Sequence, residues 1–389
     1  MGRYNFEKAP CRVGHHTYKW KEVEKDRGVL PAWIADMDFE VLPEIQQAVH
    51  DYANQLVYGY TYASEELINA VLDWERDEHD YTFERDALVF IEGVVPAIST
   101  AIQAFTKEGD AVLINTPVYP PFARSVKLNN RRLITNSLIE QDGLFQIDFE
   151  QLERDIADNE VKIYVLCNPH NPGGRVWEWE VLEKIGRLCQ KYGVLLVSDE
   201  IHQDLTLFGH EHQSFNTVSP DYFKDFSLIL ASATKTFNIA GTKNSYAVIE
   251  NPSLRHQFKK RQLANNQHEI PGLGFLATEA AYRYGWSWLM ELKEVLEKNV
   301  NFVVDYFAKE APRLRVMKPQ GTYLIWLDFS DYGLTDDQLF QLLREEAKVV
   351  LNRGSDFGQE GKGHARLNVA APETMVEEIC SRIAEVLPK

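Results

Sequence analysis

The stretch Ser232-Ala233-Thr234-Lys235-Thr236-Phe237-Asn238 decides the fold of this chain of 389 residues. It follows the apolar run 227–231, which predicts a buried strand, and it leads into a turn at Ala240-Gly241. A lysine ammonium is strongly solvated and normally stays at the surface, so Lys235 at the end of a buried strand needs a chemical reason. A covalent bond to an aldehyde provides one, because it removes the need to bury a free ammonium. A solvated loop lysine is the alternative.

A second predicted strand also carries acidic and basic side chains at its carboxyl end. The run 194–199 reads as a buried parallel strand that ends in Asp199-Glu200-Ile201-His202. An aspartate there can lie against a pyridine nitrogen and keep it protonated, so that the ring accepts electrons from a substrate carbanion. Together with Lys235, Asp199 indicates pyridoxal 5'-phosphate as the cofactor. A helix-capping aspartate is an alternative of equal weight for this residue alone.

A rigid turn follows a third apolar run. The run 163–167 stops at Asn168-Pro169-His170-Asn171-Pro172-Gly173-Gly174, at the strand end where open α/β sheets bind their ligands. Asn171 is therefore a candidate donor to the phenolic oxygen of the cofactor. A purely structural turn asparagine is the alternative.

A strand that runs directly into a helix predicts the phosphate site. The run 88–92 passes through Gly93, Val94 and Val95 into a helix that continues to Phe105. The first turn of a helix offers unpaired N–H groups and the positive end of the helix dipole, which stabilises an anion by about 0.3–1 kcal/mol. We therefore expect these three residues to bind phosphate, although many such turns bind no ligand.

The order of these motifs resembles the aspartate-aminotransferase fold of pyridoxal-phosphate enzymes (fold type I) over nearly the whole chain; the residues that carry the resemblance are Gly93-Val94-Val95, Tyr119, Asn171, Asp199, Ser232 and Lys235. Within that superfamily, four segments resemble the MalY/PatB cystathionine β-lyase group, the bacterial C–S lyases: 33–39, 58–60, 198–204 and 235–239. His202 is the most informative residue, because transaminases of this fold usually have tyrosine at this position.

The resemblance implies a role for each of these residues. Lys235 is the Schiff-base lysine and the general base, Asp199 is the partner of the pyridinium nitrogen, and Tyr119 stacks on the cofactor ring. The remaining cofactor contacts are Asn171 and His202 at the phenolic oxygen, Ser232 with Gly93, Val94 and Val95 at the phosphate, and Tyr60 reaching that phosphate from a neighbouring subunit. The last contact implies a homodimer with shared active sites, whereas a packed aromatic is the alternative for Tyr60.

Two basic residues complete the expected site. Lys243 occupies the position of a phosphate-binding arginine in many transaminases, but a lysine lacks the bidentate fork, and an exposed loop lysine is the alternative. Arg366, in the short strand 364–370, matches the arginine that binds the substrate α-carboxylate, with a surface salt bridge as the alternative. By resemblance the substrate-binding residues are Arg366, Asn171 and Ala35, and the turn 320–323 lines the same pocket.

The implied activity is that of a pyridoxal-phosphate-dependent C–S β-lyase that cleaves L-cystathionine or related cysteine S-conjugates to a thiol, pyruvate and ammonia. The alternative is a class I/II aminotransferase, which uses the same residues and differs only at His202 and in the segment 36–39. A binding protein that has lost activity is a third hypothesis, and the intact set Lys235, Asp199 and Arg366 argues against it.

The composition excludes several other classes of protein. The net charge of -17 disfavours binding to nucleic acid or to an anionic membrane. No apolar run approaches the roughly 20 residues of a membrane span, and the N-terminus lacks a signal-peptide core, so we expect a cytoplasmic enzyme. The four cysteines form no CxxC pair. His15-His16 and His210-Glu211-His212 are interpreted as solvated loop histidines, and no metal site is predicted.

The order of the elements predicts an α/β fold with two domains. β-rich runs at 88–92, 111–116, 131–138, 162–167, 194–199, 227–231 and 244–249 alternate mostly with helical segments, which predicts a largely parallel seven-stranded sheet covered by helices. The last run is a candidate antiparallel strand. Residues 44–285 form the predicted large domain; 1–43 and 286–389 form a smaller, discontinuous α+β domain, with strands near 313–316, 322–327 and 365–369 and helices at 286–307 and 336–348.

Overall fold

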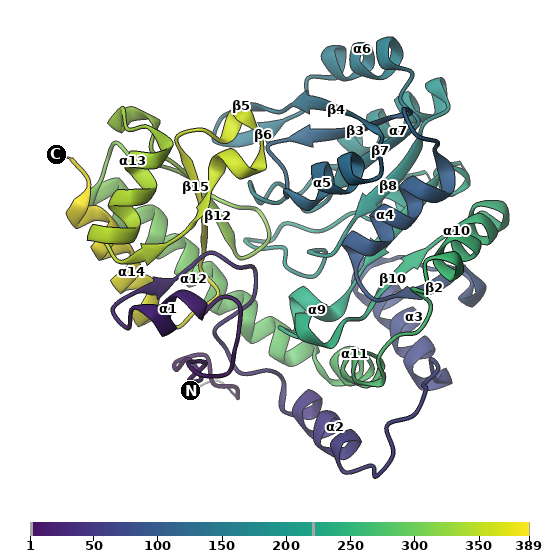
Figure 1. Cartoon of the computed structure of the whole chain (residues 1–389), viewed down its shortest axis with the longest axis horizontal. Coiled ribbons are helices and arrows are strands. Elements are labelled where there is room, and N and C mark those ends of the chain that lie inside the picture. The colour runs from purple at the N-terminus through teal and green to yellow at the C-terminus, as the bar shows by residue number, and fades with distance from the viewer. Residues whose placement is uncertain (1–2, 220–221, 389) are drawn as a thin grey trace.

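A seven-stranded sheet is the centre of the larger part of the molecule in the computed structural model, which describes residues 3–219 and 222–388 (Figure 1). Its strands lie in the order β2 (Leu88–Ile91), β10 (Ser245–Val248), β9 (Ser227–Ala231), β8 (Leu195–Asp199), β7 (Ile163–Cys167), β3 (Ala111–Thr116) and β4 (Arg132–Ser137). Only β10 runs antiparallel to its neighbours. The predicted fold class, including the antiparallel last strand, is confirmed.

Both faces of this sheet are covered, and for this reason its central strands are apolar at almost every position. In β3, Val112 and Ile114 contact one core and Ala111 and Leu113 contact the other. The first core is closed by α4 (Val94–Phe105), α5 (Pro121–Leu128) and α10 (Pro252–Ala264). The second is closed by α3 (Glu65–His79), α6 (Phe149–Asn159), α7 (Trp179–Tyr192) and α11 (Gly272–Tyr284).

A smaller antiparallel sheet lies beside the large one, on the side where both chain termini are found (Figure 1). Its strands lie in the order β11 (Arg315–Met317), β12 (Leu324–Asp328), β15 (His364–Asn368) and β14 (Asn352–Arg353). Its helices are the long α12 (Trp286–Glu310), which runs from the large sheet to the small one, α13 (Asp336–Gln341) and α14 (Glu373–Val386). The predicted helix 336–348 changes after Gln341 into π-type turns over Leu342–Glu346.

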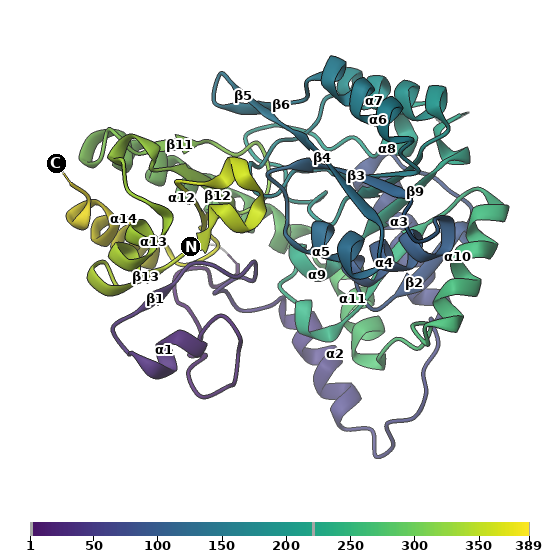
Figure 2. The ribbon, with the colours of Figure 1, turned by 45° about the horizontal axis from the view of Figure 1, so that its top comes forward.

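The N-terminal segment reaches the smaller sheet before the chain enters the large one. β1 (Leu30–Pro31) pairs in parallel with β13 (Val349–Val350), and the segment that contains α1 (Lys21–Lys25) lies next to them (Figure 2). From there the chain continues through α2 (Pro43–Ala53) toward the helices of the large sheet. Within the described parts of the chain, no helix combines the length and the apolar composition that crossing a membrane requires.

Candidate active site

Several strand ends of the large sheet meet at one cavity. It lies at the carboxyl ends of β7, β8 and β9, next to the first turn of α4, and β15 of the small sheet approaches it from the other side. Its lining residues are Ala35, Glu92, Gly93, Val94, Val95, Pro96, Tyr119, Cys167, Asn171, Asp199, Ile201, His202, Thr234, Lys235, Ala240, Lys243 and Ser245. The cavity therefore brings together most of the residues that the sequence predicted to bind the cofactor.

Lys235 projects into this cavity from a one-turn helix, α9 (Ala233–Thr236), that directly follows β9. Ser232 caps this turn, because its Oγ accepts a hydrogen bond of 3.1 Å from the amide of Thr234. The Nζ of Lys235 donates to the carbonyl oxygen of Ala35 at 2.7 Å. Burial, followed by the positive charge of Arg366, lowers the pKa of Lys235 to about 8. The amine can therefore lose its proton close to neutral pH.

Asp199 is the last residue of β8, His202 lies on the loop that follows it, and both are buried. The carboxylate of Asp199 accepts 3.1 Å from the amide of Ile201, and burial raises its pKa to about 7. Burial, together with the charges of Lys235 and Arg366, lowers the pKa of His202 to about 3, so its imidazole is neutral. Its Nδ1 is buried and finds no hydrogen-bond partner among the described residues.

Arg366 is buried in β15 and has no carboxylate partner among residues 3–219 and 222–388. Its Nη1 donates 2.8 Å to Asn171 Oδ1, and its Nη2 donates 3.0 Å to the carbonyl of Trp33 and 2.6 Å to Asn352 Oδ1. Its Nε is buried without a partner. Burial lowers the pKa of Arg366 to about 10. The alternative of a surface salt bridge is wrong for this residue, because an uncompensated buried guanidinium calls for an anionic ligand.

The predicted phosphate end is only partly arranged as expected. Gly93 caps α4 and lies with Val94 and Val95 in the cavity wall. The hydroxyl of Ser232 donates 2.7 Å to the carbonyl of Asn244, and Ser232 is not among the lining residues. Three other polar residues line the cavity instead: Thr234 in α9, Lys243 just before β10 and Ser245 in β10. The sequence offered a signal for both hydroxyl residues: Thr234 directly precedes Lys235, and Ser245 lies at the start of the predicted strand 244–249.

The two tyrosines of the predicted site differ in environment. Tyr119 lies in the cavity wall, where its amide donates 3.1 Å to the carbonyl of Asn171. Tyr60, on the loop between α2 and α3, is 94% exposed and does not line the cavity of its own chain. The alternative of a packed aromatic within this chain is therefore wrong for Tyr60.

The donor set of the cavity fits pyridoxal phosphate. A buried carboxyl group, an unpartnered imidazole nitrogen, a lysine with a lowered pKa and the first turn of a helix would suit the pyridine nitrogen, the phenolic oxygen, the aldehyde and the phosphate of that cofactor, in that order. Asp199 ends β8, His202 follows it on the next loop, and Lys235 lies on α9 just after β9, so the parallel pairing of β8 with β9 brings the three residues to one edge of the sheet.

Comparison with known proteins agrees with this arrangement. The family model of the class I and II aminotransferases matches residues 34–383. The chain belongs to this family. It is 40% identical to cystathionine beta-lyase PatB of Bacillus subtilis over 386 residues, which cover 98% of this chain and 100% of PatB.

Two solved structures are similar over almost the whole chain. Cystalysin from Treponema denticola, which contains a pyridoxal 5'-phosphate cofactor, is 34% identical with a TM-score of 0.95, covering 99% of this chain and 98% of that one. A pyridoxal-phosphate-bound putative aminotransferase from Clostridium difficile 630 is 38% identical with a TM-score of 0.95, covering 99% and 100%. The structural relatives therefore carry the cofactor that the cavity fits.

One residue near the site, Asn352, escaped the sequence analysis. It lies in the two-residue strand β14 and contacts Arg366. Tyr323 belongs to the predicted turn 320–323 and donates 3.0 Å to the carbonyl of Ala35. The interpretation of His212 as a solvated histidine is wrong, since its side chain is 1% exposed and bonds to Glu200 at 3.0 Å. Across the described ranges, no group of three or more His, Cys, Asp or Glu residues is placed to hold a metal ion.

Proposed function

We propose that this protein is a pyridoxal-phosphate-dependent C–S β-lyase that cleaves L-cystathionine or related cysteine S-conjugates to a thiol, pyruvate and ammonia. The observation that carries this proposal is the position of Lys235, which lines one cavity together with Asp199, while the positive charge of Arg366 acts on it from β15. The name and near-complete alignment of PatB support the lyase reaction over other reactions of the family.

Arg366 orients the substrate. The α-carboxylate binds to Nε and to the edge of the guanidinium that the protein partners leave free. The side-chain oxygen of Asn171 and the backbone carbonyl of Trp33, which already accept hydrogen bonds from the guanidinium, hold it in place. Placing the carboxylate at Arg366 brings the α-carbon close to Lys235, with the backbone of Ala35 on the same side of the cavity. Asn171, Ala35 and Arg366 are thus the proposed substrate-binding residues.

Lys235 anchors the cofactor and moves the proton. Because its pKa is about 8, a substantial share of its amine is unprotonated at neutral pH, and it removes the α-proton as general base. When bound, pyridoxal phosphate supplies a conjugated ring that accepts the electrons released by this deprotonation and returns them to expel the thiolate. Asp199 holds the proton at the ring nitrogen.

The other lining residues bind the cofactor. The neutral imidazole of His202 and the amide of Asn171 would hold the phenolic oxygen, and Tyr119 would cover one face of the ring. The first turn of α4, at Gly93, Val94 and Val95, would bind the phosphate together with Lys243. Ser232 would join this set if its hydroxyl turned from the carbonyl of Asn244.

The enzyme acts as a homodimer in which Tyr60 of one subunit reaches the phosphate of the other. The support is the loop between α2 and α3, whose large apolar side chains are exposed in the single chain: Leu56 is 99%, Val57 76%, Tyr58 63%, Tyr60 94% and Tyr62 86% exposed. Such a contiguous apolar segment is typical of a protein interface.

We also propose that residues 44–285 form one domain and residues 1–43 and 286–389 the other, and that the protein is located in the cytoplasm. Residues 1, 2, 220, 221 and 389 lie outside the described ranges.

The test uses purified, cofactor-loaded protein with L-cystathionine and no 2-oxo acid. Pyruvate and free thiol are measured over many turnovers, and we expect sustained release of both in equal amounts. The second candidate, an aminotransferase, is favoured by the family model and by the putative aminotransferase among the structural relatives. No release until a 2-oxo acid is added, with the substrate side chain retained in the product, would establish that candidate instead.

A further inference from the structure

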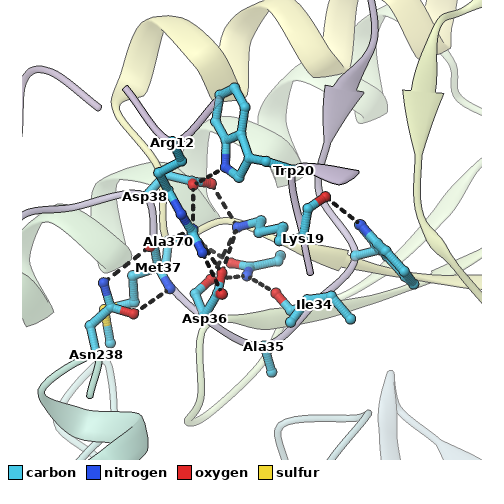
Figure 3. A network of polar contacts seen from close by, with 12 residues as sticks. Arg12, Lys19, Trp20, Ile34, Ala35, Asp36, Met37, Asp38, Asn238 and Ala370 are labelled. Atoms are coloured by element: carbon cyan, nitrogen blue, oxygen red, sulfur yellow. Dashed lines mark hydrogen bonds and ion pairs between the residues drawn. The ribbon is translucent and has the colours of Figure 1, made fainter. Parts of the chain in front are cut away.

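Four charged side chains of the N-terminal segment form a buried cluster beside the active site: Arg12, Lys19, Asp36 and Asp38, called the Asp38 cluster below (Figure 3). The side chain of Asp38 is 0% exposed and that of Lys19 is 1% exposed. Asp38 accepts 2.6 Å from Lys19, 2.9 Å from Arg12 and 2.8 Å from the indole of Trp20. Because removing such charges from water costs free energy, a buried cluster of this kind adds little to the stability of the fold, but it fixes the positions of its side chains and of the backbone that they contact.

The Asp38 cluster fixes the backbone of the turn 34–38 (Figure 3). Lys19 donates 3.0 Å to the carbonyl of Asp36, and Arg12 donates 3.3 Å to the carbonyl of Met37. Arg12 also holds the carboxylate of Asp36 with two bonds, of 3.0 and 2.7 Å. The turn is thus clamped through both its carbonyl oxygens and its side chains.

The same turn is tied to both segments that carry the central residues of the site. Asn238, three residues after Lys235, accepts 2.9 Å from the amide of Met37 and donates 3.0 Å to its carbonyl. Asn368, two residues after Arg366, donates 2.7 Å to the carbonyls of Ile34 and Asp36. The turn therefore connects the segment that carries Lys235 to the strand that carries Arg366.

The result of this clamping is the direction of one carbonyl group. The oxygen of Ala35 accepts 2.7 Å from Lys235 and 3.0 Å from the hydroxyl of Tyr323. Among the described residues it is the only hydrogen-bond partner of the lysine amine. The ionisable groups that face Lys235 from the surrounding elements are Asp36, Asp199, His202 and Arg366.

We propose that the Asp38 cluster is a positioning device that holds the Ala35 carbonyl as the resting place of the Lys235 amine whenever that amine is not covalently bound. The inference rests on the proposed function, since in every turnover of a lyase or an aminotransferase the substrate displaces this lysine from the cofactor, and the lysine bonds to the cofactor again at the end. A carbonyl acceptor stabilises the ammonium form and keeps the nitrogen within reach of its target atoms. A looser turn would let the amine leave this position.

The test is the double variant Lys19→Met/Asp38→Asn, which removes one positive and one negative charge and leaves the Arg12–Asp36 pair. Cofactor-free protein is mixed with pyridoxal phosphate between pH 6 and 10, and the rate of covalent capture is followed by absorbance. Only the unprotonated amine adds to the aldehyde. Because the ammonium loses its acceptor, we expect the midpoint of the rate profile to fall by about one pH unit. In turnover, kcat should fall about tenfold while KM changes much less.

Two further variants keep this test decisive. Trp20→Phe removes one donor to Asp38 without changing any charge, and it should shift the midpoint in the same direction by a smaller amount even if the double variant does not fold. Arg315→Met breaks the ion pair with Asp328 at the edge of the small sheet, and it should lower Tm without moving the midpoint. A midpoint unchanged in Trp20→Phe and in any folded double variant would overturn the proposal. The capture profile needs no substrate, so it stands or falls independently of the lyase reaction.

Discussion

Buried charges occur in two regions of this molecule, the strand ends that form the cavity and the N-terminal segment that carries the Asp38 cluster. In the cluster every charged side chain has an oppositely charged partner within 4 Å. Lys235 and Asp199, which line the cavity, and Arg366, which bonds to Asn171 in its wall, form no ion pair among the described residues. Buried charges that pair with one another fix the local geometry of the chain, whereas buried charges without an oppositely charged partner are typical of a site that binds a ligand.

The pKa values follow the same division. Burial moves the pKa of all three cavity groups toward their neutral forms: that of Lys235 to about 8, that of Asp199 to about 7 and that of Arg366 to about 10. In the Asp38 cluster, burial acts on Arg12 in the same direction, but the hydrogen bond and the charge of Asp36 outweigh it and raise the pKa of Arg12. The cavity is therefore prepared for proton transfer and the cluster is not.

The largest expected effect is that of Lys235→Ala, which removes both the cofactor anchor and the general base. Turnover should fall by about 10⁴-fold or more, since general base catalysis alone contributes up to about 10⁴. The fold should survive, because the side chain contributes little to either core. Steady-state kinetics and far-UV circular dichroism check both points, and normal turnover in the variant would show that the base lies elsewhere.

The next effect concerns Asp199→Asn in the cofactor-free protein. The folded-state pKa of about 7 lies above the ordinary value of 3.8, so the carboxyl stabilises the fold below pH 4 and this contribution is lost as pH rises to 7. The variant lacks this loss and should be the more stable protein at pH 8, by on the order of 4 kcal/mol, since one pKa unit corresponds to about 1.4 kcal/mol. Tm measured from pH 5 to 8 should show a gap that widens with pH. A constant gap would mean that Asp199 is ionised throughout.

A smaller effect is expected for Arg366→Ala. Losing a buried, charge-assisted contact to the carboxylate should raise KM for cystathionine by about 30- to 100-fold, which corresponds to about 2–3 kcal/mol. Arg353→Ala is the matched control, because Arg353 lies on the adjacent strand and pairs only with the exposed Asp337. The control should change KM less than about threefold. Equal KM values for both variants would place the carboxylate at another residue.

The smallest effect is expected in the paired region. Arg12→Lys keeps the charge but loses the two-bond grip on Asp36, so the free energy of unfolding should fall by about 1 kcal/mol. Urea denaturation of the cofactor-free protein measures this difference. A rise in KM for cystathionine as large as that of Arg366→Ala, with stability unchanged, would remove the distinction between the two regions.

The sequence predicted the cavity better than the segment that supports it. The seven strands are apolar runs of four to six residues, and parallel strand order brings their carboxyl ends to one edge, so Lys235, Asp199 and Asn171 could be placed together without coordinates. The resemblance to the family added Arg366, Tyr119 and His202.

The Asp38 cluster had no comparable signal. Its contacts join residues 17 to 26 positions apart in a segment of turns and one short helix, where no periodicity indicates which side chains meet. The strand β14 has only two residues, too few for a pattern, and the burial of His212 depends on its bond to Glu200. Such contacts follow from tertiary packing and are visible only in the structure.

The most direct test of the central claim is to identify the residue that carries the cofactor. Cofactor-loaded protein is reduced with borohydride, digested and analysed by mass spectrometry for the pyridoxyl-labelled peptide. We predict a single label on Lys235, in the tryptic peptide that begins at Asp225, after the cleavage site at Lys224, and contains Ser232 and Thr234. A label on Lys243, or no label in a protein that still releases pyruvate from cystathionine, would contradict the assignment of the site.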